Sequence, residues 1–89
     1  MAWTIELAES AIRQLERLDK PVVRRIRKFL HERLAPMANP RSIGAALHGE
    51  TLGQFWKYRV GDYRSITRIE DDRLIVLVVR IGHRREVYR

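Results

Sequence analysis

The sequence predicts an α+β domain of order β-α-α-β-β-β, with an antiparallel sheet and a helical hairpin packed on one face. Two changes in hydrophobic period predict this class. Apolar residues recur every second position at the start, at about 3.6 residues over the next thirty, and again at every second position in the second half. The 89 residues fit a single domain, residues 1–89, and no repeat or linker divides them.

The first half predicts a strand followed by the helical hairpin. Residues 2–7 alternate, which indicates a strand with one buried face. A helix opening at Glu9 or Ser10 follows, and Asp19-Lys20-Pro21 ends it and begins a second, because Asp caps helices and Pro is tolerated in the first turn. Each helix carries an apolar stripe: Ala11, Ile12, Leu15 and Leu18 in the first; Val22, Val23, Ile26, Phe29, Leu30 and Leu34 in the second. Both stripes are expected to pack on the sheet.

The second half predicts the remaining strands. Residues 36–53 are expected to be irregular or only partly ordered. Phe55–Val60 and Tyr63–Ile69 alternate and predict two strands joined by a tight turn at Gly61-Asp62. A polar turn then leads into Leu74–Val79, an unbroken apolar run that indicates a strand covered on both faces or central in the sheet.

Composition narrows the classes of function. The 18 Lys and Arg residues exceed the 11 Asp and Glu residues, giving a formal net charge of +7, and a basic domain favours a polyanionic partner such as nucleic acid. Solubility or an acidic protein partner are the alternative explanations of this charge. The absence of cysteine excludes disulfides, cysteine-ligated zinc and a thiol nucleophile. No membrane span or signal peptide is recognisable, so we expect a cytoplasmic protein without a membrane partner.

The basic residues of the strands are predicted to gather on one sheet face. In Phe55–Val60, Lys57 and Arg59 point away from the side that carries the apolar residues. The next strand adds Arg64, and Arg84 follows the last strand, with Tyr88 close behind it in the sequence. Because neighbouring like charges repel, we expect this face to bind an anion, although each residue alone also fits an ordinary solvated surface.

The candidate chemistry is metal-free cleavage of RNA. Glu70, Asp71 and Asp72 are consecutive in a turn and point in different directions, so no Mg²⁺ site and no cofactor are predicted. Without a metal, the 2′-hydroxyl of RNA can attack its adjacent phosphate, provided that a base, an acid and cations are present. Arginine has a pKa above about 12 and therefore stabilises charge rather than moving protons.

The sequence leaves the assignment of these roles open. Arg64 and Arg84 are the candidates for stabilising the phosphate, and Lys57, His83 and Tyr88 are the candidate proton carriers. His83 also fits a surface residue in the loop after the last strand, and Tyr88 fits a residue that packs the chain end. The further candidate RNA contacts are Arg68, Arg85, Arg24, Arg25 and Lys28. His31 and His48 are expected to be structural or exposed.

The strand FWKYRVGDYR and the ending VVRIGHRREVYR, in this element order, resemble the RelE branch of the RelE/ParE toxin superfamily. The final Glu-Val-Tyr is the part more specific to RelE-like members. The resemblance covers nearly the whole chain. It implies the toxin of a type II toxin–antitoxin system, an mRNA interferase that cuts mRNA in the ribosomal A site and is held inactive by a cognate RelB-like antitoxin.

The resemblance also implies roles for individual residues. Lys57 matches the lysine proposed as general base, and Arg59 matches a second basic residue on its strand. Arg64 and Arg84 match arginines implicated in stabilising the phosphate, and Tyr88 matches the tyrosine that stacks on or orients the substrate. Arg59 replaces the lysine often found there, and the sequence ends without the C-terminal helix of some relatives.

Two other functions fit the same sequence. A ParE-like toxin would inhibit DNA gyrase by binding and perform no chemistry, and a decayed site would leave a catalytically inactive module that binds RNA or antitoxin. In each toxin reading, the exposed basic face favours an antitoxin that is acidic and partly disordered when free.

Overall fold

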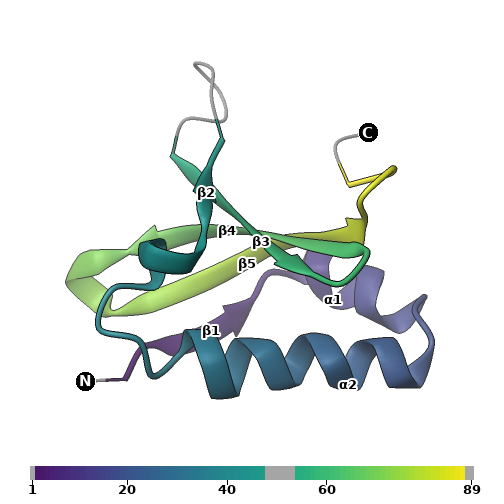
Figure 1. Cartoon of the computed structure of the whole chain (residues 1–89), viewed down its shortest axis with the longest axis horizontal. Helices are drawn as coiled ribbons and strands as arrows, with labels where there is room; N and C mark the ends of the chain where they lie inside the picture. The colour runs from purple at the N-terminus through teal and green to yellow at the C-terminus, as the bar shows by residue number, and fades with distance from the viewer. Residues whose placement is uncertain (1, 48–53, 88–89) are drawn as a thin grey trace.

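A computed structural model describes residues 2–47 and 54–87 of the chain (Figure 1). Its helices and strands are β1 (Thr4–Leu7), α1 (Glu9–Glu16), α2 (Lys20–Lys28), β2 (Ala45–Ala46), β3 (Phe55–Val60), β4 (Tyr63–Glu70) and β5 (Ile75–His83). A π-helical segment, Phe29–Leu34, continues α2, and short 3₁₀ turns cover Pro40–Ile43 and Asp71–Arg73. Within the described residues, no helix is long and apolar enough to cross a membrane. The predicted α+β class with a helical hairpin on a sheet is confirmed.

The sheet has the strand order β1-β5-β4-β3-β2. β3, β4 and β5 form the predicted antiparallel meander, and the Gly61-Asp62 turn joins β3 to β4. The expectation of a wholly antiparallel sheet is wrong at one edge, where β1 pairs parallel to β5 with Thr4 opposite Ile75. Parallel neighbours need a long crossover, which the helices and the intervening strands supply here.

The segment expected to be irregular contains two ordered pieces. Pro40–Ile43 forms a 3₁₀ turn whose Asn39 side chain accepts a hydrogen bond from the Arg41 amide. Ala45–Ala46 then pairs with β3 as the edge strand β2. A two-residue strand has too little alternation to be recognised in the sequence. Residues 48–53, which complete the segment expected to be irregular, lie outside the described residues.

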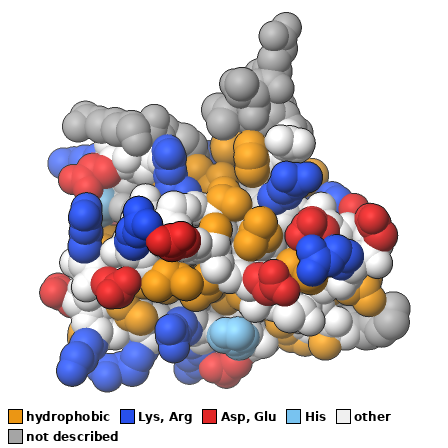
Figure 2. Space-filling model, turned by 180° about the vertical axis from the view of Figure 1, so that it is seen from behind, with side chains coloured by type: hydrophobic (Ala, Val, Ile, Leu, Met, Phe, Trp, Pro, Cys, Tyr) orange, Lys and Arg blue, Asp and Glu red, His pale blue; other side chains and the backbone are white. Residues whose placement is uncertain are grey.

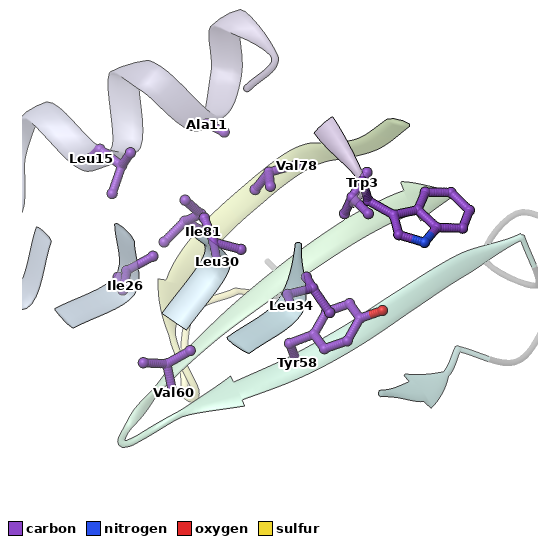
Figure 3. Close-up of a cluster of buried hydrophobic side chains, with 11 residues drawn as sticks. Trp3, Ala11, Leu15, Ile26, Leu30, Leu34, Tyr58, Val60, Val78 and Ile81 are labelled. Atoms are coloured by element: carbon purple, nitrogen blue, oxygen red, sulfur yellow. The ribbon is translucent and has the colours of Figure 1, made fainter. Parts of the chain in front are cut away.

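The main core lies between the helices and one face of the sheet (Figure 3). Side chains from α1, α2 and the π-helical segment point toward side chains of β3 and β5 (Figure 3). The buried members include Ala11, Leu15, Ile26, Leu30 and Leu34 from the helices, and Tyr58, Val60, Val78 and Ile81 from the strands. The predicted apolar stripes are therefore confirmed at these positions, and among the described residues no α-helix packs on the opposite face of the sheet.

Helix α1 also completes the edge of β5 beyond the end of β1. The Ser10 hydroxyl donates to the Val79 carbonyl at 2.7 Å, and the Gln14 side-chain oxygen accepts from the Ile81 amide at 2.6 Å. These bonds satisfy backbone groups that have no neighbouring strand on that side. β5 therefore extends to His83, four residues beyond the end predicted at Val79.

Candidate functional site

The uncovered face of the sheet brings basic residues of three strands into adjacent rows. In one row Arg59 lies opposite Arg64, and Arg64 lies opposite Gly82. In the next row Lys57 lies opposite Ile66, and Ile66 lies opposite Arg80. We call Lys57, Arg59, Arg64 and Arg80 the cationic face. The structure thus places the predicted Lys57, Arg59 and Arg64 together, and Arg68 lies on the same face further along β4, opposite Phe55.

Arg64 is held in place by the turn that it follows. Its Nη1 donates to the carbonyl oxygens of Gly61 at 3.0 Å and of Tyr63 at 2.9 Å. Gly61 has φ +60°, a conformation that favours glycine and lets the turn close tightly. Because one guanidinium nitrogen is fixed on the turn, the rest of this half-buried group is preorganised to donate to an anion.

Arg80 is a member of the cationic face that the sequence reasoning missed. The register shifts between Ile66 and Thr67, so that Arg80 faces Ile66, Val78 faces Thr67, and Val79 is an extra residue in β5. Without this bulge, alternation would place Arg80 on the helix-covered side with Val78. The sequence indicates this bulge because the apolar residues Val78 and Ile81 are three positions apart, with Val79 and the charged Arg80 between them.

The chain after β5 folds back over the uncovered face. The Arg84 amide donates to the Asp62 carbonyl at 2.8 Å, which ties this segment to the β3–β4 turn. Val87 is buried against Leu47 and Ile66, and Arg80 Nη1 donates to the Val87 carbonyl at 2.9 Å. The Arg84 and Arg85 side chains are exposed.

Tyr88 lies outside the described residues, so its predicted role has no structural description. The residue before it, Val87, is the last described residue of the chain.

His83 lies apart from the cationic face. It is the last residue of β5 rather than part of a following loop, and it shares the helix-covered side with Ile81. Its ring meets the Tyr63 ring edge-on, with centroids 5.6 Å apart, and its Nδ1 accepts from the Arg85 amide at 3.2 Å. Together with α1 residues such as Gln14, it lines a separate concavity of about 430 Å³.

The predicted helical RNA contacts are exposed on α2. Arg25 and Lys28 approach the β3–β4 turn and line a concavity together with Arg59. Arg24 does not line this concavity. On the face turned away from the view of Figure 1, basic and acidic side chains are interspersed around hydrophobic ones (Figure 2).

Among the described residues, the clearest pKa shifts belong to Tyr58, Arg41 and Asp71, which lie outside the cationic face. Burial raises the pKa of Tyr58 to about 12, and its hydroxyl donates to the Pro40 carbonyl at 2.8 Å. Arg41 donates two hydrogen bonds to the Asp71 carboxylate, at 2.9 and 2.7 Å, and these lower the pKa of Asp71. The Tyr58 bond fastens the 3₁₀ turn Pro40–Ile43 to β3, and the Arg41 bonds fasten it to the second 3₁₀ turn, Asp71–Arg73. In residues 2–47 and 54–87, no three His, Asp or Glu side chains are grouped so that they could hold a metal ion.

The arrangement is suited to holding a polyanion. Arginine and lysine donors from β3, β4 and β5 converge on one face, and Arg64 is rigidly placed among them. Charge-assisted hydrogen bonds of this kind bind phosphate oxygens strongly.

Comparison with known proteins identifies the family. The family model described as ParE toxin of the type II toxin–antitoxin system, parDE, matches residues 5–88. The chain is 30% identical to Toxin RelG of Mycobacterium tuberculosis over 89 residues, which is 100% of this chain and 99% of that protein.

Solved structures share the whole fold. The toxin–antitoxin complex RelBE2 from M. tuberculosis matches with a TM-score of 0.85 and 26% identity, covering 93% of this chain and 92% of that chain. An arginine-to-alanine variant of E. coli toxin RelE, bound to an antitoxin peptide, matches at 0.71 and 26%, covering 93% and 84%. The archaeal RelE–RelB complex from Pyrococcus horikoshii, at 0.74 and 22% identity, covers 98% and 100% and supports the fold. The resemblance seen in the strand and ending motifs is confirmed, and the chain belongs to the RelE/ParE superfamily as a RelE-like toxin of a type II toxin–antitoxin system.

Proposed function

We propose that this toxin is a ribosome-dependent endoribonuclease that cuts mRNA and so inhibits translation. The observation that carries the proposal is the cationic face, where Arg59 lies directly opposite Arg64 and Lys57 and Arg80 occupy the next row. Like charges directly opposite each other, as at Arg59 and Arg64, oppose folding by some tenths of a kcal/mol. A polyanionic substrate would relieve that repulsion.

The reaction needs no metal ion in this proposal. The 2′-oxygen loses its proton to Lys57 and forms a bond to the adjacent phosphorus, the bond from phosphorus to the 5′-oxygen breaks, and that oxygen takes up a proton from water. The products are a 2′,3′-cyclic phosphate and a 5′-hydroxyl. Lys57 serves as the base, and Arg59, Arg64 and Arg84 stabilise the charge that develops on the phosphate.

Two further assignments complete the site. Tyr88 stacks on or orients the substrate, as the resemblance implies. His83 is not given the proton transfer because it lies on the helix-covered side of β5. The remaining basic candidates contact RNA away from the reacting phosphate: Arg68, Arg85, Arg24, Arg25 and Lys28.

The ribosome would supply what this site lacks. Its cations stabilise charge, but the described residues of the cationic face include no group whose ordinary pKa lies near neutrality. Correct positioning of reacting groups can contribute about 7–11 kcal/mol in favourable cases. We therefore expect an mRNA held for in-line attack in the A site to be cut much faster than free RNA.

The proposed regulator is a RelB-like antitoxin in the cytoplasm. Similar toxins have been solved in complex with RelB antitoxins. An acidic segment, partly disordered when free, would fold over the cationic face and exclude RNA from it.

A cell-free translation reaction tests the proposal. Purified toxin is added, and new 5′ ends on the mRNA are mapped by primer extension. We expect cuts phased with the codons, fragments whose 5′-hydroxyl ends accept phosphate from polynucleotide kinase without prior phosphatase, and little cleavage of naked RNA. Intact mRNA, or fragments that carry 5′-phosphates, would contradict the proposal.

Gyrase inhibition is the second candidate, because the matching family model is that of ParE toxins. In this case the toxin would block supercoiling by purified gyrase and leave mRNA intact in the translation reaction. A catalytically inactive module would do neither and would still bind RNA or antitoxin.

A further inference from the structure

A second basic surface lies at the free edge of β3, between that strand and the α2 side of the molecule. It is a concavity of about 290 Å³. Its lining residues come from α2, the π-helical segment and the end of β3 with its turn: Arg25, Lys28, Phe29, Glu32, Arg33, Arg59, Val60 and Gly61. Four of these are cations and one is a carboxylate. β2 pairs only with Trp56 and Lys57, so among the described residues no strand covers the edge at this end of β3.

The arginines of this concavity are held in position. An ideal Cβ built on Gly61 would lie 2.9 Å from Arg25 Nη1, so the Arg25 guanidinium rests directly on the turn. The Arg33 guanidinium lies over the Phe29 ring, 5.7 Å from its centroid. Both groups therefore present their donors around an apolar floor formed by Phe29 and Val60.

These cations differ from arginines elsewhere on the surface. Arg13, Arg41 and Arg73 each form an ion pair with a nearby carboxylate. Within the part of the chain that the structure describes, Arg25, Lys28, Arg33 and Arg59 form none, although Glu32 lines the same concavity. Four cations gathered around a hollow with a single carboxylate favour binding of an anion, and guanidinium groups suit the oxygens of a phosphate.

We propose that this concavity, lined by Arg25, Lys28, Arg33 and Arg59, is a second phosphate-binding site that holds the sugar–phosphate backbone of the RNA. Arg59 joins it to the cationic face, because Arg59 lies opposite Arg64 and also lines the concavity. A nucleic-acid strand can occupy both places, since its charges repeat along the chain. The proposal rests on RNA as the substrate and adds where the strand continues beyond the reacting phosphate.

The test compares two double variants of equal net charge. Lys28→Gln with Arg33→Gln removes two cations of the concavity, and Arg17→Gln with Arg27→Gln removes two that line other parts of the helical hairpin's surface. The dissociation constant for a short single-stranded 2′-O-methyl RNA, which cannot be cleaved by 2′-hydroxyl attack, is measured at several salt concentrations. Binding is thereby separated from catalysis.

We expect the concavity variant to bind this RNA about tenfold more weakly. Its plot of log affinity against log salt should be shallower by about 1.4, because each lost contact to a single-strand phosphate removes about 0.7. The control variant should stay within twofold of the unmodified protein. Equal losses in both variants, or no loss in either, would overturn the proposal.

Two other outcomes are informative. If the concavity variant loses affinity only for an acidic antitoxin and binds RNA normally, the surface is a protein contact and the proposal is wrong. If the RNA pattern is as expected but the unmodified toxin cuts no mRNA on ribosomes, the second phosphate site stands and the proposed nuclease activity fails.

A titration of the unmodified protein with inorganic phosphate keeps the test valid if a variant does not fold. Amide resonances of Phe29, Val60 and Gly61 should shift in nuclear magnetic resonance spectra, while those of Leu7 and Ile12, which line a different concavity, should not. Shifts that are absent, or that spread equally over the helices, would contradict the site.

Discussion

The two faces of β3 carry opposite kinds of side chain on one backbone. Tyr58 and Val60 point into the core beneath the helices, whereas Lys57 and Arg59 lie on the uncovered side. The covered face packs many apolar groups, whereas the described residues of the uncovered face form a small cluster around Leu47, Ile66 and Val87. Stability and anion binding therefore depend on alternate residues of the same strands, so substitutions on the two faces should have separable effects.

The largest effect is expected from truncating the covered face. Tyr58 is fully buried, packs on Phe29 with ring centroids 6.1 Å apart and donates a hydrogen bond to Pro40. Tyr58→Ala should lower the free energy of unfolding by about 3–5 kcal/mol, as large-to-small core changes do. Urea denaturation followed by circular dichroism measures this loss. Lys57→Ala, on the other face, should change it by less than about 1 kcal/mol; a similar loss in both variants would break the comparison.

On the uncovered face the largest expected effect concerns activity. Arg64→Ala should reduce mRNA cleavage on ribosomes by about 10²–10³-fold, the cost of losing one preorganised donor to a developing negative charge. Arg64→Lys keeps the charge but lacks the planar guanidinium group with its several donors, so it should recover only part of the rate. Cleavage rates come from timed primer extension, with the melting temperature checking that the turn remains folded. A normal rate for Arg64→Ala would remove this residue from the site.

A smaller effect is expected at Arg80, which holds the carbonyl of Val87 next to Tyr88. Arg80→Ala should slow cleavage about fivefold, corresponding to about 1 kcal/mol for one hydrogen bond. The matched control is Arg73→Ala, because the exposed Arg73 pairs with the half-buried Glu70 through an ion pair of 3.7 Å. Equal rates for the two variants would show that tethering the C-terminal turn is unimportant.

The smallest expected effect is a pH dependence of the free energy of unfolding, which arises from Tyr58 on the covered face. Because burial raises the pKa of Tyr58 from 10.0 to about 12, the unfolded phenol ionises first as pH rises. Its contribution to stability is fully present below pH 10 and is lost between pH 10 and about 12. The stability difference between the unmodified protein and Tyr58→Phe should therefore shrink over this range in denaturation curves. A constant difference would show that Tyr58 is not protected from ionisation.

Alternation in the sequence was sufficient to predict which residues of β3 face the core, and therefore where Lys57 and Arg59 lie. It failed where a backbone irregularity changes the phase. The bulge at Val79 turns Arg80 to the uncovered face and Ile81 to the core, and the sequence indicates it only through the spacing of three between Val78 and Ile81. The parallel pairing of β1 and the short strand β2 were also missed, because both depend on partners distant in the chain.

The continuation of β5 and its bulge also explain why His83 lies on the helix-covered side of the sheet. The sequence suggested a loop residue near the basic cluster, but α1 satisfies the edge of β5 and lets the strand continue to His83. The bulge then sets its face together with that of Ile81. The motifs in strand and ending were nevertheless enough to identify the superfamily, because they span the segments that carry the basic residues.

The central claim is that the position of the positive charge, rather than its amount, determines cleavage. It is tested most directly by comparing two triple variants, Arg59→Gln with Arg64→Gln and Arg80→Gln, and Arg13→Gln with Arg17→Gln and Arg27→Gln. Each lowers the formal net charge by three, from +7 to +4. In timed mRNA cleavage on ribosomes, we expect the cationic-face variant to lose more than about 10²-fold in rate and the helical variant to stay within threefold. Equal losses in the two variants, or a cationic-face variant that still cuts mRNA normally, would contradict the claim.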